Sequence, residues 1–466
     1  MKPLRILIVS TYFPPAPSIA SLRTYSFAKY WARMGNDVTV LTTKKEDFGE
    51  VALNLPVENF TVLEIPFFNV FAVAKRLLKA LTGVGRGAGN GGGGRASETG
   101  SSAPGERAFI KLKNRLKRFA ENCGIFITDR IPDVNDFWIG RAIAVGERLI
   151  KEKGCDWIFS SYAPPASHIV AGKLAVNKNC RWVADYRDLW IENHVWVGKW
   201  PFTVLEKVLE KKYVGRRADL VTTVSEPLAV VLRRKFSAPV HVIENGYDED
   251  DYRGDFPPWF TGEKKRIVYT GTVYPGKRDP SPLFAVLSDL AGTSGEIRRK
   301  MDEKLEVLFF GSESEWLSGL IREQGVQRWV RHGGMVSRDE ALRIQKQADL
   351  LLFLEWENGS VNGILTGKLF EYLAMRKPIL GVGVSSRTTP GALMEETGVG
   401  LAVGNDREKI RRVLLNLLDG GIPFPVNPKD DVIRRYTRRR QAERLLEIME
   451  RCGAPEKSPV GPLVPR

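Results

Sequence analysis

The feature that most limits the fold of this chain is a regular alternation of short apolar segments with amphipathic ones. Segments 21–34 and 202–217 carry apolar residues at helical spacing. Buried strands are expected at 5–10, 37–42, 156–160, 181–184, 220–224 and 241–246. A strand, a helix and a further strand in succession form a βαβ unit. The first half of the chain therefore predicts a doubly wound α/β sheet.

A second series of the same kind follows a linker rich in Asp, Pro and Gly at 247–262. Its strands are expected at 266–269, 305–310, 329–332, 350–354 and 378–383. A chain of 466 residues is too long for one ordinary core. We expect two doubly wound Rossmann-like domains, with the carboxyl ends of both sheets facing one interdomain cleft. The predicted domains are residues 1–255 and 262–425, and a helical segment at 426–455 returns to the first domain.

The segment 366–380 carries the clearest functional pattern. A helix is predicted to open just after Gly367, to carry Glu371 in its first turns and to end before Pro378, where a buried strand follows. The free N–H groups and the dipole at a helix start attract an anion. A carboxylate one turn further in accepts hydrogen bonds from ribose hydroxyls. The segment therefore predicts a nucleotide site.

Composition excludes several classes of protein. The four cysteines show no paired spacing, and no zinc or redox motif is present, so a reducing cytoplasm is the simplest setting. The apolar stretch near the start is too short for a signal peptide, and no apolar run reaches about 18 residues, so we expect no membrane span. Residues 463–466 match the remnant of a thrombin-cleavable tag, so we expect them to have no part in the fold or the function.

The formal charge of +15 is unevenly placed. Residues 71–130 hold twelve basic and four acidic side chains, a net +8. Within them a glycine-rich tract, about 83–105, predicts a mobile loop because it cannot bury an apolar core. Basic amphipathic segments at 70–81 and 109–119 flank it. They suit an anionic membrane surface, or they pack on their own domain. No nucleic-acid motif is present, so we expect no nucleic-acid partner.

Several motifs occur together in a characteristic order. They are Tyr-Phe-Pro-Pro at 12–15, the strand region 35–42, residues 218–225 and 242–248, and Tyr-Thr-Gly at 269–271, followed by 307–311, 348–350 and the segment 366–380. In these motifs the chain resembles the retaining glycosyltransferases of family 4, which have the two-domain GT-B fold. Residues 160–168 and 183–190 resemble a subgroup acting in capsule, exopolysaccharide and O-antigen assembly.

The resemblance implies transfer of a sugar from a UDP or GDP sugar to an acceptor hydroxyl, with retention of anomeric configuration. It also implies that no metal or other cofactor is needed, because protein charges stabilise the leaving diphosphate. The acidic string 248–250 fits the metal-binding pattern Asp-x-Asp of the other glycosyltransferase fold. Outside its structural context a solvated acidic turn is the expected interpretation. The expected acceptor is lipid-linked or a polysaccharide, at the inner face of the cytoplasmic membrane.

The resemblance assigns donor-binding residues in the second domain. Glu371 matches the ribose-binding glutamate of the family. The position of its sugar-binding glutamate holds Gly363, so Asn362, the backbone of Gly363, Glu355 or Glu357 would replace it. Lys277 matches the diphosphate-binding lysine, whereas the arginine position holds Thr272. Arg278 and Lys368 are candidates for the missing charge. The remaining expected contacts are backbone groups at Gly271 and around Val336.

The first domain offers acceptor-side candidates. The catalytic histidine of the family aligns near Ser161, and His168 follows on a predicted helix, where it points into the cleft or packs inside. Asp185, Arg187 and Asp188 follow a strand end and contact the acceptor, assist proton removal or form a buried Arg–Asp pair. Arg23 contacts a phosphate or the acceptor, or forms a surface salt bridge.

Two rival functions remain open from the sequence. One is a GT-B-fold sugar epimerase, which needs no acceptor. The other is a non-catalytic nucleotide-sugar sensor or partner subunit, favoured by Gly363 and Thr272. The context of a pyridoxal-binding lysine, which a phosphorylase needs, is not found.

Overall fold

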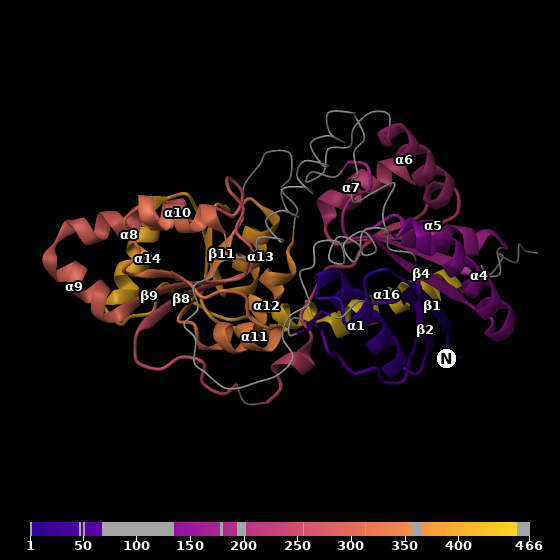
Figure 1. Ribbon diagram of the computed structural model, residues 1–466, viewed down its shortest axis with the longest axis horizontal. Helices are drawn as coiled ribbons and strands as arrows, with labels where there is room; N and C mark the ends of the chain where they lie inside the picture. Colours follow the sequence, from indigo (N-terminus) through magenta and orange to yellow (C-terminus); the bar gives the residue numbers. More distant parts are fainter. Residues whose placement is uncertain are drawn as a thin grey trace, which may run out of the picture.

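The computed structural model describes residues 2–45, 48–49, 52–67, 135–177, 180–192, 202–254, 256–312, 314–355 and 365–453. In this part the chain forms two α/β domains that lie side by side (Figure 1). The expected fold class is confirmed, because each domain is built on a parallel sheet with the expected alternation of helices. The glycine-rich loop 83–105, the basic segments 70–81 and 109–119, and residues Asn362, Gly363, Glu357 and 463–466 lie outside the described residues.

The first domain contains a seven-stranded sheet in the order β3-β2-β1-β4-β5-β6-β7. All of its strand pairs are parallel. The strands are β1 (Arg5–Val9), β2 (Asp37–Thr43), β3 (Thr61–Ile65), β4 (Trp157–Tyr162), β5 (Arg181–Tyr186), β6 (Leu220–Thr223) and β7 (Val240–Val242). The helices are α1 (Ile19–Arg33), α4 (Asp136–Lys153), α5 (Ala166–Leu174), α6 (Phe202–Glu210) and α7 (Glu226–Lys235). The segment 202–217 was expected to be one helix, but α6 ends in a π-helical turn at Lys211–Gly215.

The second domain contains a six-stranded sheet in the order β10-β9-β8-β11-β12-β13, also parallel throughout. The strands are β8 (Lys265–Thr270), β9 (Leu305–Phe310), β10 (Val330–His332), β11 (Leu350–Leu354), β12 (Ile379–Val382) and β13 (Gly400–Gly404). The helices are α8 (Ser281–Thr293), α9 (Gly295–Lys304), α10 (Glu315–Glu323), α11 (Arg338–Gln347), α12 (Gly367–Met375), α13 (Thr389–Thr397), α14 (Arg407–Leu418), α15 (Asp430–Arg435) and α16 (Arg438–Gly453).

Local sequence explains why α1 begins where it does and which face it buries. Ser18 caps the helix, because its side chain accepts a hydrogen bond from the backbone N–H of Ser21 at 3.1 Å. On the inner face, Phe27 stacks on Trp31 at 4.9 Å, and both rings contact Phe159 of β4. These apolar contacts hold α1 on the first sheet.

The last helix, α16, leaves the second domain and packs on α1 of the first (Figure 1). The indole N–H of Trp31 donates to the carbonyl of Ala442 at 3.0 Å. Arg438, at the start of α16, donates to the carbonyl of Gly246, just before the linker, at 2.8 Å. The linker, α1 and α16 therefore form one bundle at the domain boundary.

The acidic string 248–250 is not a solvated turn, contrary to the expectation from the sequence. Asp248 is buried and forms an ion pair of 2.8 Å with Lys29, and Asp250 pairs with both Lys29 and Arg33. Tyr30 also donates to Asp248 at 2.6 Å. These partners hold the pKa of Asp248 below its usual range, although burial opposes them. The two carboxylates fasten the linker to α1.

In the part of the chain that the structure describes, no helix has the length and apolar content needed to cross a membrane.

Candidate functional site

The carboxyl end of β8 and the start of α12 form the centre of the candidate donor site. Gly271 follows β8 with φ +130°, a backbone conformation that favours glycine. A Cβ placed on Gly271 would clash with Nζ of Lys368, in the first turn of α12. The same amine lies over the ring of Tyr269, 3.9 Å from its centroid. The absence of a side chain at Gly271 therefore leaves the space that the Lys368 amine occupies.

Two cations lie close together at this edge of the second sheet. Burial of the Lys368 amine lowers its pKa to about 7, and the nearby Arg278 guanidinium adds to the effect. Glu371 and Glu355 oppose it. Arg278 lies 3.5 Å from the carboxylate of Glu355, the residue that follows β11. Lys368 and Arg278 repel each other when both are charged. An anion bound beside the helix start would interact favourably with both side chains.

Glu371, which the sequence predicts to contact a ribose, lies one turn further along α12 than Lys368. It is half-buried, and one of its oxygens lies 3.5 Å from the side-chain N–H of Gln345 on α11. That amide donates more closely to the hydroxyl of Thr270, at 2.9 Å. Gln345 was not identified from the sequence, and nothing in its local pattern distinguishes it from other polar residues of an amphipathic helix.

Loops after β8, β9 and β10 meet beside this centre. The hydroxyl of Thr272 lies 3.5 Å from that of Ser312, and the Ser312 hydroxyl lies 3.8 Å from the sulfur of Met335. Val336 is half-buried and packs on the core below α12. Lys277 and Arg278 lie in a tight turn, where both backbone N–H groups donate to the carbonyl of Tyr274 at 3.0 Å. The structure thus gathers Gly271, Thr272, Arg278, Val336, Lys368 and Glu371 on neighbouring elements.

A pocket between the two domains borders the start of α12. Its lining includes Ile19 from α1, Asn245 from the segment after β7 and Gly367 from α12. A Cβ on Gly367 would lie 3.1 Å from the Ile19 side chain, and the Asn245 amide lies 3.5 Å from the carbonyl of Leu365. The first domain therefore reaches the donor helix at this boundary.

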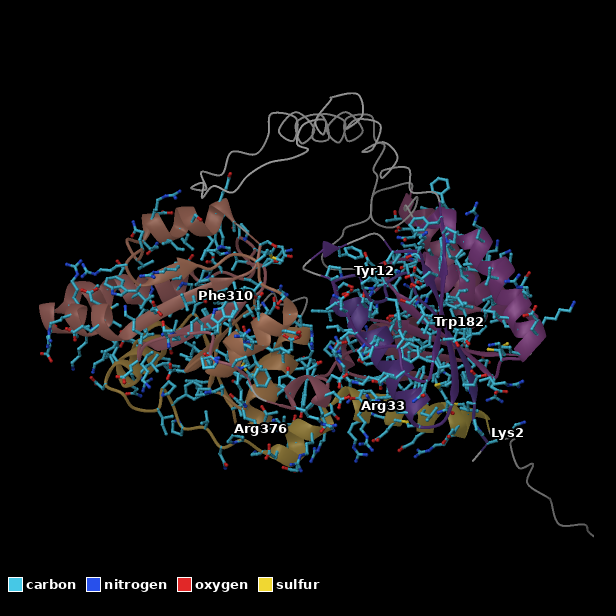
Figure 2. All side chains as sticks on the ribbon, turned by 60° about the horizontal axis from the view of Figure 1, so that its bottom comes forward. Lys2, Tyr12, Arg33, Trp182, Phe310 and Arg376 are labelled. Carbon is cyan, nitrogen blue, oxygen red and sulfur yellow. The ribbon has the colours of Figure 1, made fainter. Side chains whose placement is uncertain are left out.

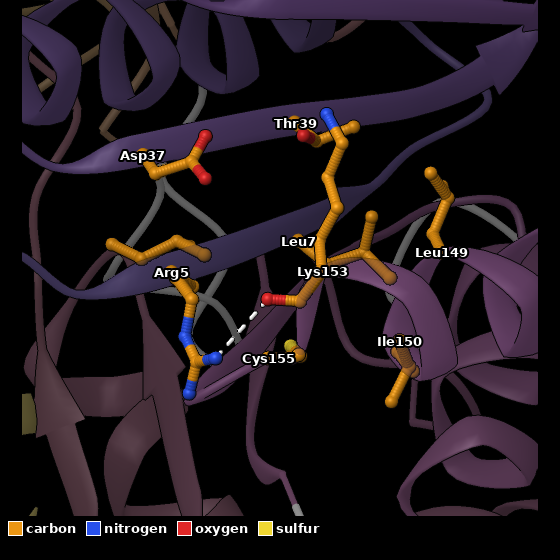
Figure 3. A pocket seen from close by; sticks show the side chains of 10 residues that line it. Arg5, Leu7, Asp37, Thr39, Leu149, Ile150, Lys153 and Cys155 are labelled. Carbon is orange, nitrogen blue, oxygen red and sulfur yellow. Dashed lines mark hydrogen bonds between the residues drawn. The ribbon is translucent and has the colours of Figure 1, made fainter.

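A second hollow lies near the amino ends of β1 and β4, at the edge of the first sheet opposite to the carboxyl ends of its strands (Figure 3). Arg5 there donates to the carbonyl of Lys153 at 3.1 Å and pairs with Asp156 at 2.8 Å. Ligands of doubly wound sheets bind at the carboxyl ends of the strands. This hollow is therefore not part of the candidate site.

Arg23 and Asp185 form a buried ion pair. Two guanidinium N–H groups of Arg23 donate to the two carboxylate oxygens at 2.8 and 3.0 Å. Asp185 also accepts from Ser161 at 2.9 Å and from Thr222 at 2.8 Å. Of the alternatives left open by the sequence, Asp185 matches the buried pair, and Arg23 is its partner. The prediction of a surface salt bridge for Arg23 is wrong, because the residue is 5% exposed.

His168 is fully buried among aromatic rings, so it is the packed histidine of the two alternatives. Its Nδ1 lies 2.8 Å from the hydroxyl of Ser160, and its ring contacts Tyr186 at 4.9 Å and Trp182 at 5.9 Å. Burial lowers its pKa to about 3, which keeps the ring neutral. We do not retain His168 as a catalytic candidate.

Of the predicted acceptor-side residues, Arg187 and Asp188 stay candidates, and the structure adds Tyr12 and Lys45 near the carboxyl edge of the first sheet. Arg187 and Asp188 follow β5 and are half-buried, and Arg187 donates to the carbonyl of Ala163 at 2.9 Å. Tyr12 follows β1, is 40% exposed and lies at the side of its domain nearest the second domain (Figure 2). Lys45, which was not predicted, follows β2. Its amine donates to the carbonyl of Thr11 at 2.6 Å, and burial lowers its pKa to about 7.

Comparison with known proteins supports the fold and the broad class. Residues 117–251 match the family Glycosyltransferase Family 4. No curated protein sequence matches the chain. A glycosyltransferase from Rickettsia africae ESF-5 is similar in structure over 98% of this chain and 100% of that one, with 14% identity and a TM-score of 0.58.

Two further solved structures have a similar fold. Sucrose-phosphate synthase from Thermosynechococcus elongatus is 11% identical over 96% of this chain and 98% of that one, with a TM-score of 0.55. WaaG, a glycosyltransferase involved in lipopolysaccharide biosynthesis, is 12% identical over 97% and 98%, with a TM-score of 0.50. The GT-B fold expected from the sequence is confirmed. The family match and the fold together support a glycosyltransferase of the family 4 type. The narrower subgroup of capsule and O-antigen enzymes stays a prediction.

Proposed function

We propose that the protein is a retaining glycosyltransferase that uses a nucleoside diphosphate sugar of the UDP or GDP type. The acceptor is a hydroxyl of a lipid-linked or polysaccharide molecule in the synthesis of a cell-surface glycan, at the inner face of the cytoplasmic membrane. The observation that carries the proposal is the pair of neighbouring cations formed by Lys368, in the first turn of α12, and Arg278, in the turn after β8.

The residues of the donor site suit each part of such a donor. The diphosphate lies against Lys368, Arg278 and the free N–H groups at the start of α12, and Lys277 stands in the same turn as Arg278. The ribose hydroxyls donate to Glu371. The base lies near Val336 and the loop after β9. The sugar then projects toward the first domain, where Tyr12, Arg187 and Asp188 face the acceptor.

The proposed reaction breaks the bond between the anomeric carbon and the oxygen of the β-phosphate. A bond forms between that carbon and the acceptor oxygen on the same face of the sugar, and the acceptor proton passes to the leaving phosphate. Negative charge grows on the diphosphate as the bond breaks, so Lys368 and Arg278 stabilise the transition state more than the ground state. The proposal requires no metal ion, because these side chains supply the positive charge.

A panel of UDP- and GDP-sugars, each tested for binding and for release of nucleoside diphosphate, examines this proposal. Slow hydrolysis of one or two donors, accelerated by a membrane extract that contains acceptor, is the expected result. Binding without turnover would favour a nucleotide-sugar sensor, and recovery of an epimerised donor would favour an epimerase. Absence of binding to every donor would contradict the proposed site.

A further inference from the structure

Helix α6 of the first domain turns apolar side chains toward solvent and acidic side chains toward the core. Val204, Leu205 and Val208 are 52%, 47% and 56% exposed, whereas Glu206 and Glu210 are 2% and 1% exposed. A surface helix of a globular protein normally turns its apolar face toward the core. Positions 204, 205 and 208 share one side of the helix, so the three apolar side chains form a single outward patch.

Specific contacts fix the helix in this orientation. Glu210 accepts a hydrogen bond from the hydroxyl of the buried Tyr186 at 3.1 Å, and it forms an ion pair with Lys235 of α7. Burial raises the pKa of Glu210, and the Lys235 ammonium opposes this shift. Rotating α6 to bury its valines would expose Glu210 and break its contacts with Tyr186 and Lys235. The outward apolar patch is therefore a stable feature of the fold.

The charges around the patch indicate what covers it. Lys207, Lys211 and Lys212 are exposed beside the apolar side chains, and both acids of α6 are buried. A second copy of the chain would bring two lysine-rimmed faces together, which like-charge repulsion disfavours. An anionic lipid surface accepts both features, because lysines contact the headgroups and apolar side chains enter the acyl boundary.

The position of α6 also suits a lipid surface. The helix follows β5, whose carboxyl end carries Arg187 and Asp188 at the acceptor edge, and it leads back toward the start of β6. The apolar patch lies in the first two turns of the helix. Figure 1 shows α6 at the outer rim of the first domain, away from the second sheet.

We propose that α6 is a docking helix for an anionic membrane surface, with Val204, Leu205 and Val208 entering the lipid and Lys207, Lys211 and Lys212 contacting the headgroups. Membrane contact through α6 stands on these observations alone. Its benefit for catalysis, presenting a lipid-linked acceptor to the cleft, rests on the proposed function. The described helix locates the contact independently of the basic segments at 70–81 and 109–119.

Vesicle flotation of the full chain tests the assignment. The probe is vesicles of phosphatidylcholine and phosphatidylglycerol in equal parts, compared with phosphatidylcholine alone. The variant combines Val204→Ser, Leu205→Gln and Val208→Ser, all at exposed positions that leave the buried contacts intact. Its partition onto anionic vesicles is expected to fall roughly tenfold or more, because the apolar contribution is removed. The control Ile422→Gln, at a position 67% exposed in the second domain, should bind as the wild type does.

Two further measurements locate the contact. Amide hydrogen exchange of residues 202–215 should slow when anionic vesicles are added to the wild type. Undiminished flotation of the triple variant, or no slowing at 202–215, would overturn the assignment. A wild-type dimer that the triple variant converts to a monomer would also overturn it, in favour of a second copy. Donor hydrolysis without vesicles should be equal in both proteins. If the wild type hydrolyses no donor but α6 is still needed for flotation, only the proposed function fails.

Discussion

Replacement of Lys368 by methionine tests the diphosphate site through both affinity and proton uptake. Methionine keeps the length of the side chain and removes the amine. In the ligand-free protein the pKa of Lys368 is about 7, because burial between Tyr269 and Gly271 desolvates its amine and the Arg278 guanidinium lies near it. A bound diphosphate supplies the missing negative charge and returns the pKa toward the ordinary value of about 10.4. Binding therefore draws a proton from solvent.

The size of the effect follows from these two pKa values. At pH 8 roughly one-tenth of the ligand-free amines carry the proton and nearly all of the bound ones do, so uptake is about 0.9 proton per nucleoside diphosphate. Loss of one charge-assisted contact weakens binding by about 1.5–3 kcal/mol, or roughly 10- to 150-fold in Kd. Uptake attributable to Lys368 should fall to about zero in Lys368→Met, by the same linkage.

Calorimetric titration with UDP and GDP at pH 8, in two buffers of different ionisation enthalpy, measures both quantities. Lys377→Met is a matched control, because burial also lowers the pKa of Lys377, which precedes β12 at the opposite edge of the sheet. The control should keep the affinity and the proton uptake of the wild type. Equal affinity in Lys368→Met, or a wild type that takes up no proton, would show that Lys368 does not bind the diphosphate.

Stability supplies a second, opposite readout for Lys368. Its folded pKa lies below the unfolded value, so between pH 7 and about 10 the unfolded chain binds more protons, and stability rises with pH across that window. At pH 7 and below, the amine is charged although it is desolvated, which lowers the free energy of unfolding. Lys368→Met should therefore raise the melting temperature of the ligand-free protein near neutral pH while it weakens binding. A fall in both would indicate a purely structural lysine.

Three other variants test separate contacts in the two domains. Glu371→Gln should weaken UDP or GDP binding by about tenfold, but leave binding of 2′,3′-dideoxy analogues unchanged; an equal loss for both ligands would contradict the ribose contact. Gly271→Ala should lower the free energy of unfolding by about 1–3 kcal/mol in urea titrations, and it should weaken nucleotide binding, because φ is +130° and the new Cβ meets Lys368. A wild-type free energy of unfolding together with wild-type affinity would contradict this conformation of the loop. Asp185→Asn leaves Arg23 buried without its charge partner and should cost about 3–5 kcal/mol of stability, whereas full stability with abolished turnover would assign the carboxylate to the reaction.

The sequence predicted the fold well because its periodicity is local. Strands at 305–310 and 350–354 were predicted with the bounds that β9 and β11 have in the structure, and the helix carrying Glu371 begins at Gly367, one residue before its predicted start. β3 was not predicted, because Thr61–Ile65 is a half-exposed strand with a glutamate in it. The end of α6 was misplaced, since a π-helical turn keeps the helical spacing of apolar residues.

The polar contacts could not be predicted in the same way. Asp248 is paired with Lys29, a residue 219 positions away, so no local pattern shows that the acidic string is buried. His168 could lie in a cleft or a core until the rings of Tyr186 and Trp182 were placed around it. The reversed orientation of α6 was also invisible, because the spacing of Val204, Leu205 and Val208 is the same whichever face packs inward.

A crystal structure of the protein with the tightest-binding nucleoside diphosphate would show where the donor binds. We expect the diphosphate within hydrogen-bond distance of the Lys368 amine and the Arg278 guanidinium, and the ribose hydroxyls on the carboxylate of Glu371. A nucleotide bound elsewhere, or one at this edge whose ribose points away from Glu371, would contradict the assignment of the second domain as the donor site.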